Sequence, residues 1–458
     1  MTTKSFAVAP AQDDAHIVAR LERLPISRIL VMARLVVGTA TFFDAYDSLT
    51  IAYVLPVLVG LWHIEQSQIG LLISAGNAGQ LIGALCFGWI ADRIGRLRAL
   101  ALSIALFALG SLACAFATDY ASLFTLRTIE GIGLGGEVPV AAAYIGEMAK
   151  AKGRGIFFLL YEGIFGVGLF FAALAGVWMV PRFGWQSMFY LGAVPALIAL
   201  GLRRMLPESA RWLADKGRLS QANEVVTFLE REAERRGKVL PPLNPALAVA
   251  QRERAPWSEL FSPLYRQRTF TVWALWFCSY FVSYGLSSWL PTLYRTVFKL
   301  DLQTSLTYGL ITVTCGLVGT LGVAFVVDKT GRKLWFIMAY IGSATPLLVL
   351  WFIGAKSAET LVFWASLAYF FTGSNSNLCY LYTAEIYPTR LRARGTATAT
   401  AWLRLGSTIG PGVVGFIIGG YGLNAVFLMF GCVALIGATV AATAAIETKE
   451  RVLEEVSP

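Results

Sequence analysis

The chain has 458 residues, of which 56% are hydrophobic and only 14% are charged. Soluble domains carry about 25% charged residues, so the composition excludes an ordinary soluble domain and predicts an all-α polytopic membrane protein with apolar runs of about 20 residues. The net charge of +10 does not indicate nucleic-acid binding, because the basic residues are concentrated in alternate loops between these runs.

Twelve membrane-spanning helices are predicted, in two groups of six. The first group covers residues 35–62, 68–91, 97–118, 122–148, 155–180 and 186–204. The second group covers residues 268–296, 304–327, 333–354, 358–386, 393–420 and 423–446. The expected organisation is a cytoplasmic segment at 1–34, a six-helix bundle at 35–204, a cytoplasmic linker at 205–266, a second six-helix bundle at 267–446 and a cytoplasmic tail at 447–458. The linker is charged, and we expect short amphipathic helices in it, such as residues 219–236.

Lysine and arginine are distributed unevenly among the loops. Thirteen of them lie between Arg203 and Arg268, and others cluster after the second, fourth, eighth and tenth predicted spans, whereas the intervening loops hold few. Because basic loops stay on the cytoplasmic side, both termini are expected there, in a protein of the bacterial inner membrane. The first 25 residues are polar and include acids, which is not the pattern of a cleaved signal peptide.

Two acids interrupt the first predicted span. Asp44 and Asp47 lie well inside it, and their spacing of three residues places both on one face of a helix. Acids at such depth are costly, so they normally face a cavity, pair with a cation or carry protons. The alternative is a polar rim at headgroup level.

Further charged residues occur in later spans. Arg127, Glu130 and Glu137 lie in the fourth span, Glu162 in the fifth and Arg404 in the eleventh. Arginine stays ionised, so Arg404 either binds a carboxylate substrate through two hydrogen bonds or neutralises an aspartate of the first span. We expect Arg127 to pair with Glu130 or Asp47 in the cavity, and Glu162 to line it.

Aromatic and amide side chains provide the remaining cavity candidates. Hydroxyl and amide groups inside a span must find partners, which favours a cavity for Tyr46, Tyr280, Tyr284, Asn377 and Tyr380. The alternative is core packing or contact with lipid. A planar substrate stacked on these rings, with its carboxylate on Arg404, would use all of these features.

The two groups of spans repeat each other. The sequence DRIGR at residues 92–96 recurs as DKTGR at residues 328–332. A glutamate and an arginine seven residues apart also occur twice, as Glu147 with Arg154 and as Glu385 with Arg392. Internal repeats of this kind mark transporter folds whose substrate site lies near the midplane, between two pseudo-symmetric halves.

Several motifs resemble those of the major facilitator superfamily, from about residue 30 to the C-terminus. Residues 88–96, GWIADRIGR, look like its loop motif, although the second copy has Ala324 in place of the glycine. Residues 127–135 are similar to its RxxxGxGxG motif, residues 207–213, PESARWL, to PESPRWL of sugar-porter-like and organic-ion branches, and residues 447–449, ETK, to their C-terminal ending. Residues 135–141 and 401–406 resemble the niacin-transporter and organic-ion group.

This resemblance implies twelve helices and an ion-pair network between the halves that is closed in the outward-facing state and broken in the inward-facing state. Gly88 is expected to let the second helix approach its neighbour closely. The residues assigned to this gating network are Gly88, Asp92, Arg96, Glu147, Arg154, Asp328, Arg332, Glu385 and Arg392.

The predicted function is proton-coupled import of a small organic anion, an aromatic carboxylate such as nicotinate or a benzoate, by alternating access. Asp44 or Asp47 would bind the proton, and the sequence leaves open which one does. The expected partners are the substrate, protons and the lipid bilayer, without nucleic acid, and a monomer is expected. The sequence contains no phosphate-binding loop motif, so ATP-driven transport is not predicted.

The alternatives are a sugar or polyol symporter, an organic-cation transporter and, from another class, a membrane receptor or sensor. An enzyme is not predicted, because the spans show no nucleophile with a nearby base. Neither a cofactor nor a metal site is expected, since the six cysteines are scattered singly and the chain has only two histidines.

Overall fold

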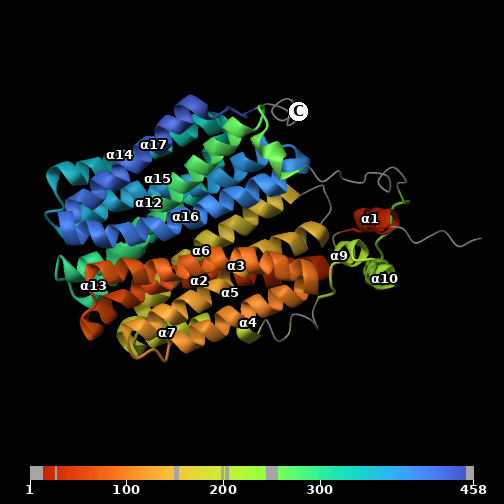
Figure 1. Cartoon of the computed structure of the whole chain (residues 1–458), viewed down its shortest axis with the longest axis horizontal. Helices are drawn as coiled ribbons and strands as arrows, with labels where there is room; N and C mark the ends of the chain where they lie inside the picture. The colour runs from red at the N-terminus through yellow and green to blue at the C-terminus, as the bar shows by residue number, and fades with distance from the viewer. Residues whose placement is uncertain are drawn as a thin grey trace, which may run out of the picture.

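The computed structural model describes residues 14–25, 28–148, 154–197, 201, 206–243 and 256–449. Every regular element within these ranges is a helix. Figure 1 shows the long helices side by side, with the short helices α1, α9 and α10 gathered beyond one end of the bundle. The all-helical fold that the sequence predicts is therefore confirmed.

The N-terminal half is built from α2 to α7. Their bounds are Arg28–Trp62 for α2, Gln66–Ile94 for α3, Arg96–Cys114 for α4, Tyr120–Met148 for α5, Arg154–Phe183 for α6 and Gln186–Gly192 for α7. The sixth span was predicted as one continuous helix over residues 186–204, but α7 ends at Gly192, a turn follows at residues 193–195, and helical structure resumes at residues 196–197 and 201. Pro195 lies in this turn and has no backbone N–H to continue a helix.

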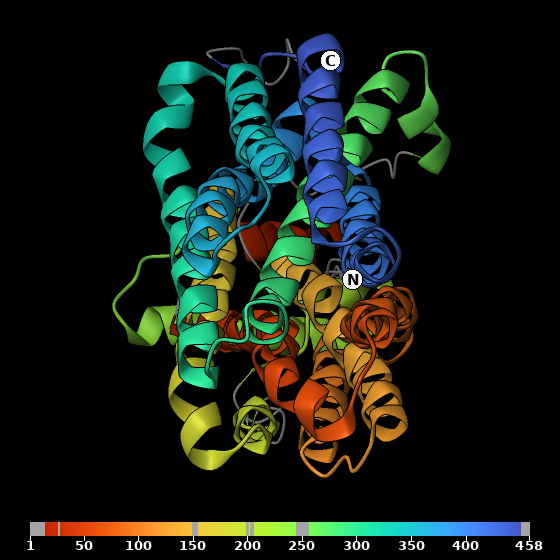
Figure 2. The same ribbon diagram turned by 90° about the vertical axis from the view of Figure 1, so that its left-hand side faces the viewer.

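The C-terminal half is built from α12 to α17. Their bounds are Arg266–Thr296 for α12, Leu302–Thr330 for α13, Arg332–Ile353 for α14, Ala358–Ile386 for α15, Thr389–Tyr421 for α16 and Leu423–Ala444 for α17. Figure 2 separates the two halves, with the blue and green helices above and the orange helices below. Each predicted span of this half corresponds to one of these helices.

Eight helices in the described part of the chain are long and apolar enough to cross a membrane. The helices α5, α12 and α15 are not among them, although they have 29, 31 and 29 residues. At 1.5 Å per residue each is more than about 40 Å long and exceeds a hydrocarbon core of about 30 Å. Their charged, aromatic and amide residues lower the hydropathy, and these residues reappear at the site below.

A small helical cluster lies at the end of the bundle where α3 and α13 finish. It contains α1 (Asp14–Arg23), α9 (Ala210–Asp215) and α10 (Leu219–Arg235), and a 3₁₀ helix follows at Trp257–Phe261. The predicted amphipathic helix at residues 219–236 is thus confirmed to within one residue. Arg20 and Arg23 of α1 both bind Glu230 of α10, at 2.5 and 2.6 Å, which ties the N-terminal segment to the linker.

Two glycine turns end α3 and α13 in the same way. Gly95 and Gly331 have φ values of +108° and +91°, a region that favours glycine. Beside them, Glu208 accepts hydrogen bonds from the backbone N–H groups of Arg96 and Leu97, and Glu447 accepts from those that follow Gly331. The PESARWL and ETK motifs therefore supply a carboxylate to equivalent helix N-termini, where anions are favoured.

Close packing of α3 on α5 depends on glycines near the middle of α3. A Cβ atom on Gly79 or Gly83 would overlap the backbone carbonyl oxygen of Thr128 or Ile132. By contrast, a Cβ atom on Gly88 would meet nothing within 4 Å. The expectation that Gly88 permits the close approach is therefore wrong in this structure, because the helices converge before α3 reaches that residue.

The two halves meet along α3 and α16. A Cβ atom on Gly70 would lie 2.8 Å from the carbonyl oxygen of Gly412, and one on Gly415 would overlap that of Gln66. Further along, Ser74 donates to the carbonyl oxygen of Thr408 at 2.7 Å. These contacts lie at the end of α3 away from α1, α9 and α10, so the halves are in direct contact at that end.

Candidate functional site

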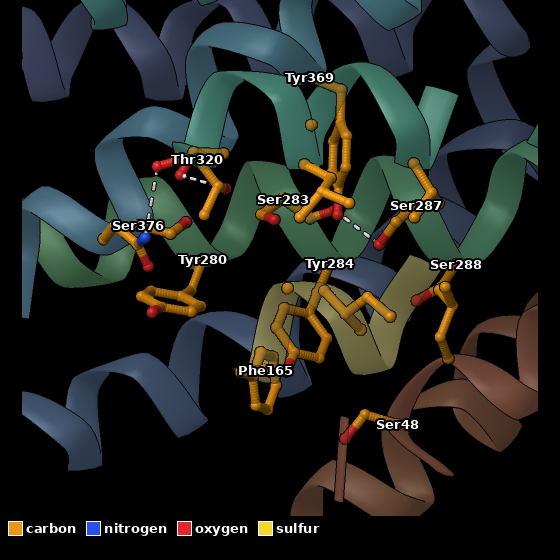
Figure 3. A pocket seen from close by; sticks show the side chains of 18 residues that line it. Ser48, Phe165, Tyr280, Ser283, Tyr284, Ser287, Ser288, Thr320, Tyr369 and Ser376 are labelled. Atoms are coloured by element: carbon orange, nitrogen blue, oxygen red, sulfur yellow. Dashed lines mark hydrogen bonds between the residues drawn. The ribbon is translucent and has the colours of Figure 1, made fainter. Parts of the chain in front are cut away.

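A narrow cavity lies between the two halves, with a volume of about 60 Å³. This is smaller than the roughly 300–1,000 Å³ of typical pockets for small molecules, so a substrate would require the cavity to widen. Figure 3 shows the side chains that line it, from α2, α6, α12, α13 and α15. The polar lining residues are Ser48, Tyr280, Ser283, Tyr284, Ser287, Ser288, Thr320, Tyr369, Ser376 and Asn377.

The helix α12 supplies half of these polar side chains because of its sequence spacing. Tyr280, Ser283, Tyr284, Ser287 and Ser288 recur at three- and four-residue intervals, which places them on one face of a helix. The rings of Tyr280 and Tyr284 lie 6.2 Å apart between centroids, with their planes at 38°. Among the described residues that line the cavity, none is charged. The cavity wall therefore offers aromatic faces and neutral hydroxyl groups.

Behind this wall, Arg127 holds two acids in the N-terminal half. Its Nη1 atom lies 3.0 and 2.9 Å from the two carboxylate oxygens of Asp47 and 2.7 Å from Oε2 of Glu130. Only 3% of the Arg127 side chain and 0% of either acid is exposed. Cys114 donates to Oε2 of Glu130 at 3.3 Å. We call Asp47, Arg127 and Glu130 the Asp47 cluster.

A second set of charges lies where the halves meet, and we call Asp44, Glu137 and Arg404 the Asp44 cluster. The Nη2 atom of Arg404 is 4.0 Å from Oδ2 of Asp44, whose side chain is 1% exposed. Glu137 is fully buried and lies within electrostatic reach of both. Within the described residues, no donor meets hydrogen-bond geometry at any carboxylate oxygen of Asp44 or Glu137, and the hydroxyl of Thr41 lies near Glu137.

The Asp44 cluster is connected to the cavity by two side chains. Arg404 donates a hydrogen bond from Nη1 to Oε1 of Gln80, and Nε2 of Gln80 donates to the hydroxyl of Ser48 in the cavity wall at 3.4 Å. Tyr284 lies within electrostatic reach of Arg404 and Asp44. A molecule bound at Ser48 and Tyr284 would therefore interact electrostatically with this cluster.

Comparison with models of known protein families identifies the family of this chain. The model described as "Sugar (and other) transporter" matches residues 30–458. The chain belongs to this transporter family. It is thus an integral membrane protein of the major facilitator superfamily, as the sequence motifs predicted.

Similar transporters include the niacin transporter NiaP of Acinetobacter baylyi, which is 33% identical over 96% of this chain and 99% of its own length. The gallate transporter of Pseudomonas putida is 29% identical over 88% of each chain. Among solved structures, a D-xylose–proton symporter matches with a TM-score of 0.72 at 20% identity, over 92% of this chain and 99% of its own. That structural likeness confirms the twelve-helix fold of this transporter.

The transporter brings three of the predicted substrate-binding residues to the cavity, namely Tyr280, Tyr284 and Asn377. Two others lie elsewhere. The hydroxyl of Tyr46 donates to the carbonyl oxygen of Met188 on α7 at 2.9 Å, and the ring of Tyr380 packs edge-on against Trp276, 4.4 Å away. Arg404 lies behind the wall, and the side chain of Glu162 is outside the described residues.

The predicted gating charges form equivalent pairs in the two halves. Arg96 binds Asp92 at 2.6 Å and Glu147 at 2.9 Å. In the second half, Arg332 binds Asp328 and Glu385, both at 2.9 Å. These ion pairs lie within each half, so pairing between halves stays a prediction.

The two arginines predicted seven residues after the glutamates are described only in part. Arg392 at the start of α16 is half-buried, and its Nε atom has no partner within the described residues. The side chain of Arg154 lies outside the described part of the chain. Neither arginine therefore tests the predicted contact between halves.

The sequence analysis assigned no role to two members of the transporter's site. Glu137 was recognisable as a charged residue in the fourth span, seven residues after Glu130 and hence on the same helix face. Gln80 is one of two amides, with Asn77, in a glycine-rich stretch of the second span. The buried polar side chain was the available signal in both cases, but its partner on α16 is distant in sequence.

Proposed function

We propose that this transporter imports a small aromatic carboxylate, such as nicotinate or a benzoate, together with protons. The observation that carries the proposal is Asp44, a buried acid with no hydrogen-bond partner in the described structure, 4.0 Å from Arg404 and next to an aromatic cavity. An isolated charge at this depth costs about 2.5–3.5 kcal/mol on insertion scales. A proton that binds there and leaves again would couple the cluster to transport.

The two acids of the first span have different roles in this proposal. Both oxygens of Asp47 accept hydrogen bonds from Arg127, so Asp47 holds α2 against α5. Asp44 is the proton-coupling residue, because it lies beside the interface between halves. The names of the relatives support the substrate class, since one transports niacin and another gallate.

Proteoliposomes with an imposed pH gradient test this assignment. The wild type is expected to accumulate labelled nicotinate or benzoate, and Asp44→Asn to lose accumulation while it still exchanges substrate in counterflow. Glu224→Gln on the exposed face of α10 is the matched control. If Asp44→Asn still accumulates substrate as the wild type does, Asp44 is not the coupling residue.

A neutral, hydroxylated substrate is the second candidate. It is favoured by the absence of charged side chains from the described cavity wall, where serine, threonine, tyrosine and asparagine offer hydrogen bonds. Thermal-shift measurements with nicotinate, benzoate, nicotinamide and a pentose distinguish the two. Stabilisation by the carboxylates alone supports the anion, and stabilisation by the pentose alone supports the sugar-like substrate.

We further propose that the structure represents the inward-facing state, with both termini in the cytoplasm of a bacterial inner membrane and with the protein acting as a monomer. The halves touch at the end away from the basic loops, so the cavity would open toward those loops. In a background without the native cysteines, Asn377→Cys should react with an impermeant thiol reagent in inside-out vesicles. Reaction only in right-side-out vesicles would contradict this orientation.

A further inference from the structure

Glu137 is a buried acid whose chemistry the coupling scheme above does not use. It lies on α5 with 0% of its surface exposed; within the described residues no donor meets hydrogen-bond geometry at either carboxylate oxygen, and the hydroxyl of Thr41 on α2 lies near them. A buried carboxylate without a donor is strongly unfavourable while it is ionised. Whether the Glu137 carboxyl is ionised or protonated therefore depends on the charged groups around it.

The charged groups within electrostatic reach of Glu137 are Asp44 on α2 and Arg404 on α16. The helices α3 and α4, which pack closely on α5, bring no other charged side chain there within the described residues; α3 contributes the neutral amide of Gln80. Two acids thus share one guanidinium. With both acids ionised the cluster carries a net charge of −1, and one bound proton makes it neutral.

Geometry indicates which acid holds that proton. Asp44 lies at ion-pair distance from Arg404, 4.0 Å, whereas the described part of the chain places no cation within ion-pair distance of Glu137. An ionised Asp44 is therefore compensated by its neighbour, and an ionised Glu137 is not. When two acids lie close together, one of them generally keeps its proton.

We propose that Glu137 is a second proton-binding carboxyl of this transporter, which shares one exchangeable proton with Asp44 across Arg404. The proton comes from water on one side, binds a carboxylate oxygen of Glu137 or Asp44, and returns to water on the other side, with no other bond made or broken. This inference rests on the proposed proton coupling for its role in transport. The bound proton itself is a property of the folded protein.

Infrared spectroscopy of the purified protein detects that proton without any transport. The C=O stretch of protonated carboxyl groups is recorded in H₂O and D₂O for the wild type, Glu137→Gln, Asp44→Asn and the control Glu224→Gln. Glu137→Gln should lose one component of this band, and Glu224→Gln should lose none. An unchanged band in Glu137→Gln overturns the proposal.

Asp44→Asn gives a more specific result. With Asp44 neutral, Glu137 becomes the only acid beside Arg404 and should ionise, so this variant should lose the same component although it removes an acid assigned as ionised. Persistence of the component in Asp44→Asn, together with its loss in Glu137→Gln, would refute sharing. The infrared comparison applies to each variant that elutes as a folded, monodisperse protein. If Glu137→Gln does not fold, Glu137→Asp takes its place, and the carboxyl component should then shift in frequency.

Transport then tests the role of the shared proton. A pH difference of one unit supports about tenfold accumulation for each proton carried with a monoanion at zero membrane potential, because 1.4 kcal/mol corresponds to tenfold. Glu137→Gln should fall to equilibration while it keeps counterflow, and Glu137→Asp should recover accumulation. Wild-type accumulation by Glu137→Gln overturns the coupling role. Absence of coupling in the wild type rejects the proposed function, and the infrared result still decides whether Glu137 binds a proton.

Discussion

Replacing Arg127 with methionine removes the cation that Asp47 and Glu130 share, and leaves two acids with 0% exposure unpaired. Each hydrogen bond to a charged group contributes about 1.5–3 kcal/mol, so the loss of one partner each for Asp47 and Glu130 amounts to roughly 3–6 kcal/mol. Breaking a buried ion pair from one side costs about 3–5 kcal/mol by independent measurement. We expect Arg127→Met to lose about 3–5 kcal/mol of unfolding free energy.

This loss is large enough to measure as a shift of the thermal unfolding midpoint in detergent. At about 2–4 °C per kcal/mol for 150–250 residues, roughly the size of one half, the midpoint should fall by roughly 6–20 °C. Arg182→Met is the matched control, because Arg182 is exposed at the end of α6 and, within the described residues, contacts the carbonyl oxygen and the ring of Trp178 without pairing with an acid. It should change stability by less than about 0.5 kcal/mol.

A rescue experiment separates loss of charge balance from loss of packing. Combining Arg127→Met with Asp47→Asn and Glu130→Gln removes both unpaired charges, and replacement of a whole buried ion pair is often nearly neutral. The triple variant should therefore be more stable than Arg127→Met alone. The reasoning is refuted if Arg127→Met is as stable as Arg182→Met, or if the triple variant is no better than the single one.

Three further outcomes follow from the contacts of single residues. Gly83→Ala should lose about 1–3 kcal/mol through overlap with the backbone of α5, whereas Gly88→Ala should change stability by less than about 1 kcal/mol; equal midpoints for the two would contradict the packing. Burial opposes ionisation of Glu447, but backbone N–H donors outweigh this effect and lower the pKa of Glu447. The wild type should therefore be more stable than Glu447→Gln at neutral pH, and this difference should disappear as the pH falls through the lowered pKa. For Glu208, burial outweighs the backbone donors and raises the pKa of the carboxyl. The stability that the Glu208 carboxyl contributes is therefore present at low pH and lost as the pH rises through the raised pKa. If the unfolding midpoints of Glu208→Gln and Glu447→Gln follow the same pH trend, this reasoning is contradicted. Tyr284→Phe should weaken accumulation under a pH gradient more than it weakens counterflow exchange, as measured by uptake of labelled substrate in the two assays. An equal loss in the two assays would indicate a binding role alone.

The fold could be predicted from the sequence because a membrane limits the choices. A span must be long and largely apolar, and only a helix satisfies its own backbone hydrogen bonds there. The prediction at 304–327 accordingly matches α13, Leu302–Thr330. The turn at residues 193–195 inside the sixth span was not predicted, because hydropathy does not register the loss of one N–H at Pro195.

The site could be predicted only in part because a polar side chain shows that it needs a partner but not where the partner is. Tyr284 lines the cavity, whereas the hydroxyl of Tyr46 donates a hydrogen bond to Met188 on a neighbouring helix. The same ambiguity applies to the arginines. Arg127 has its acids on α2 and α5, one of them three residues away and predictable, but the contact of Arg404 with Gln80 joins residues 324 positions apart.

The glycine contact between α3 and α16 bears on the energy of the transport cycle. Gly70, Gly412 and Gly415 bring backbone against backbone there, so at these three positions no side chain has to be withdrawn when the two helices separate. The free energy of separation is then small for each residue, and two arrangements of the same halves can remain close in energy, as a carrier that visits both requires.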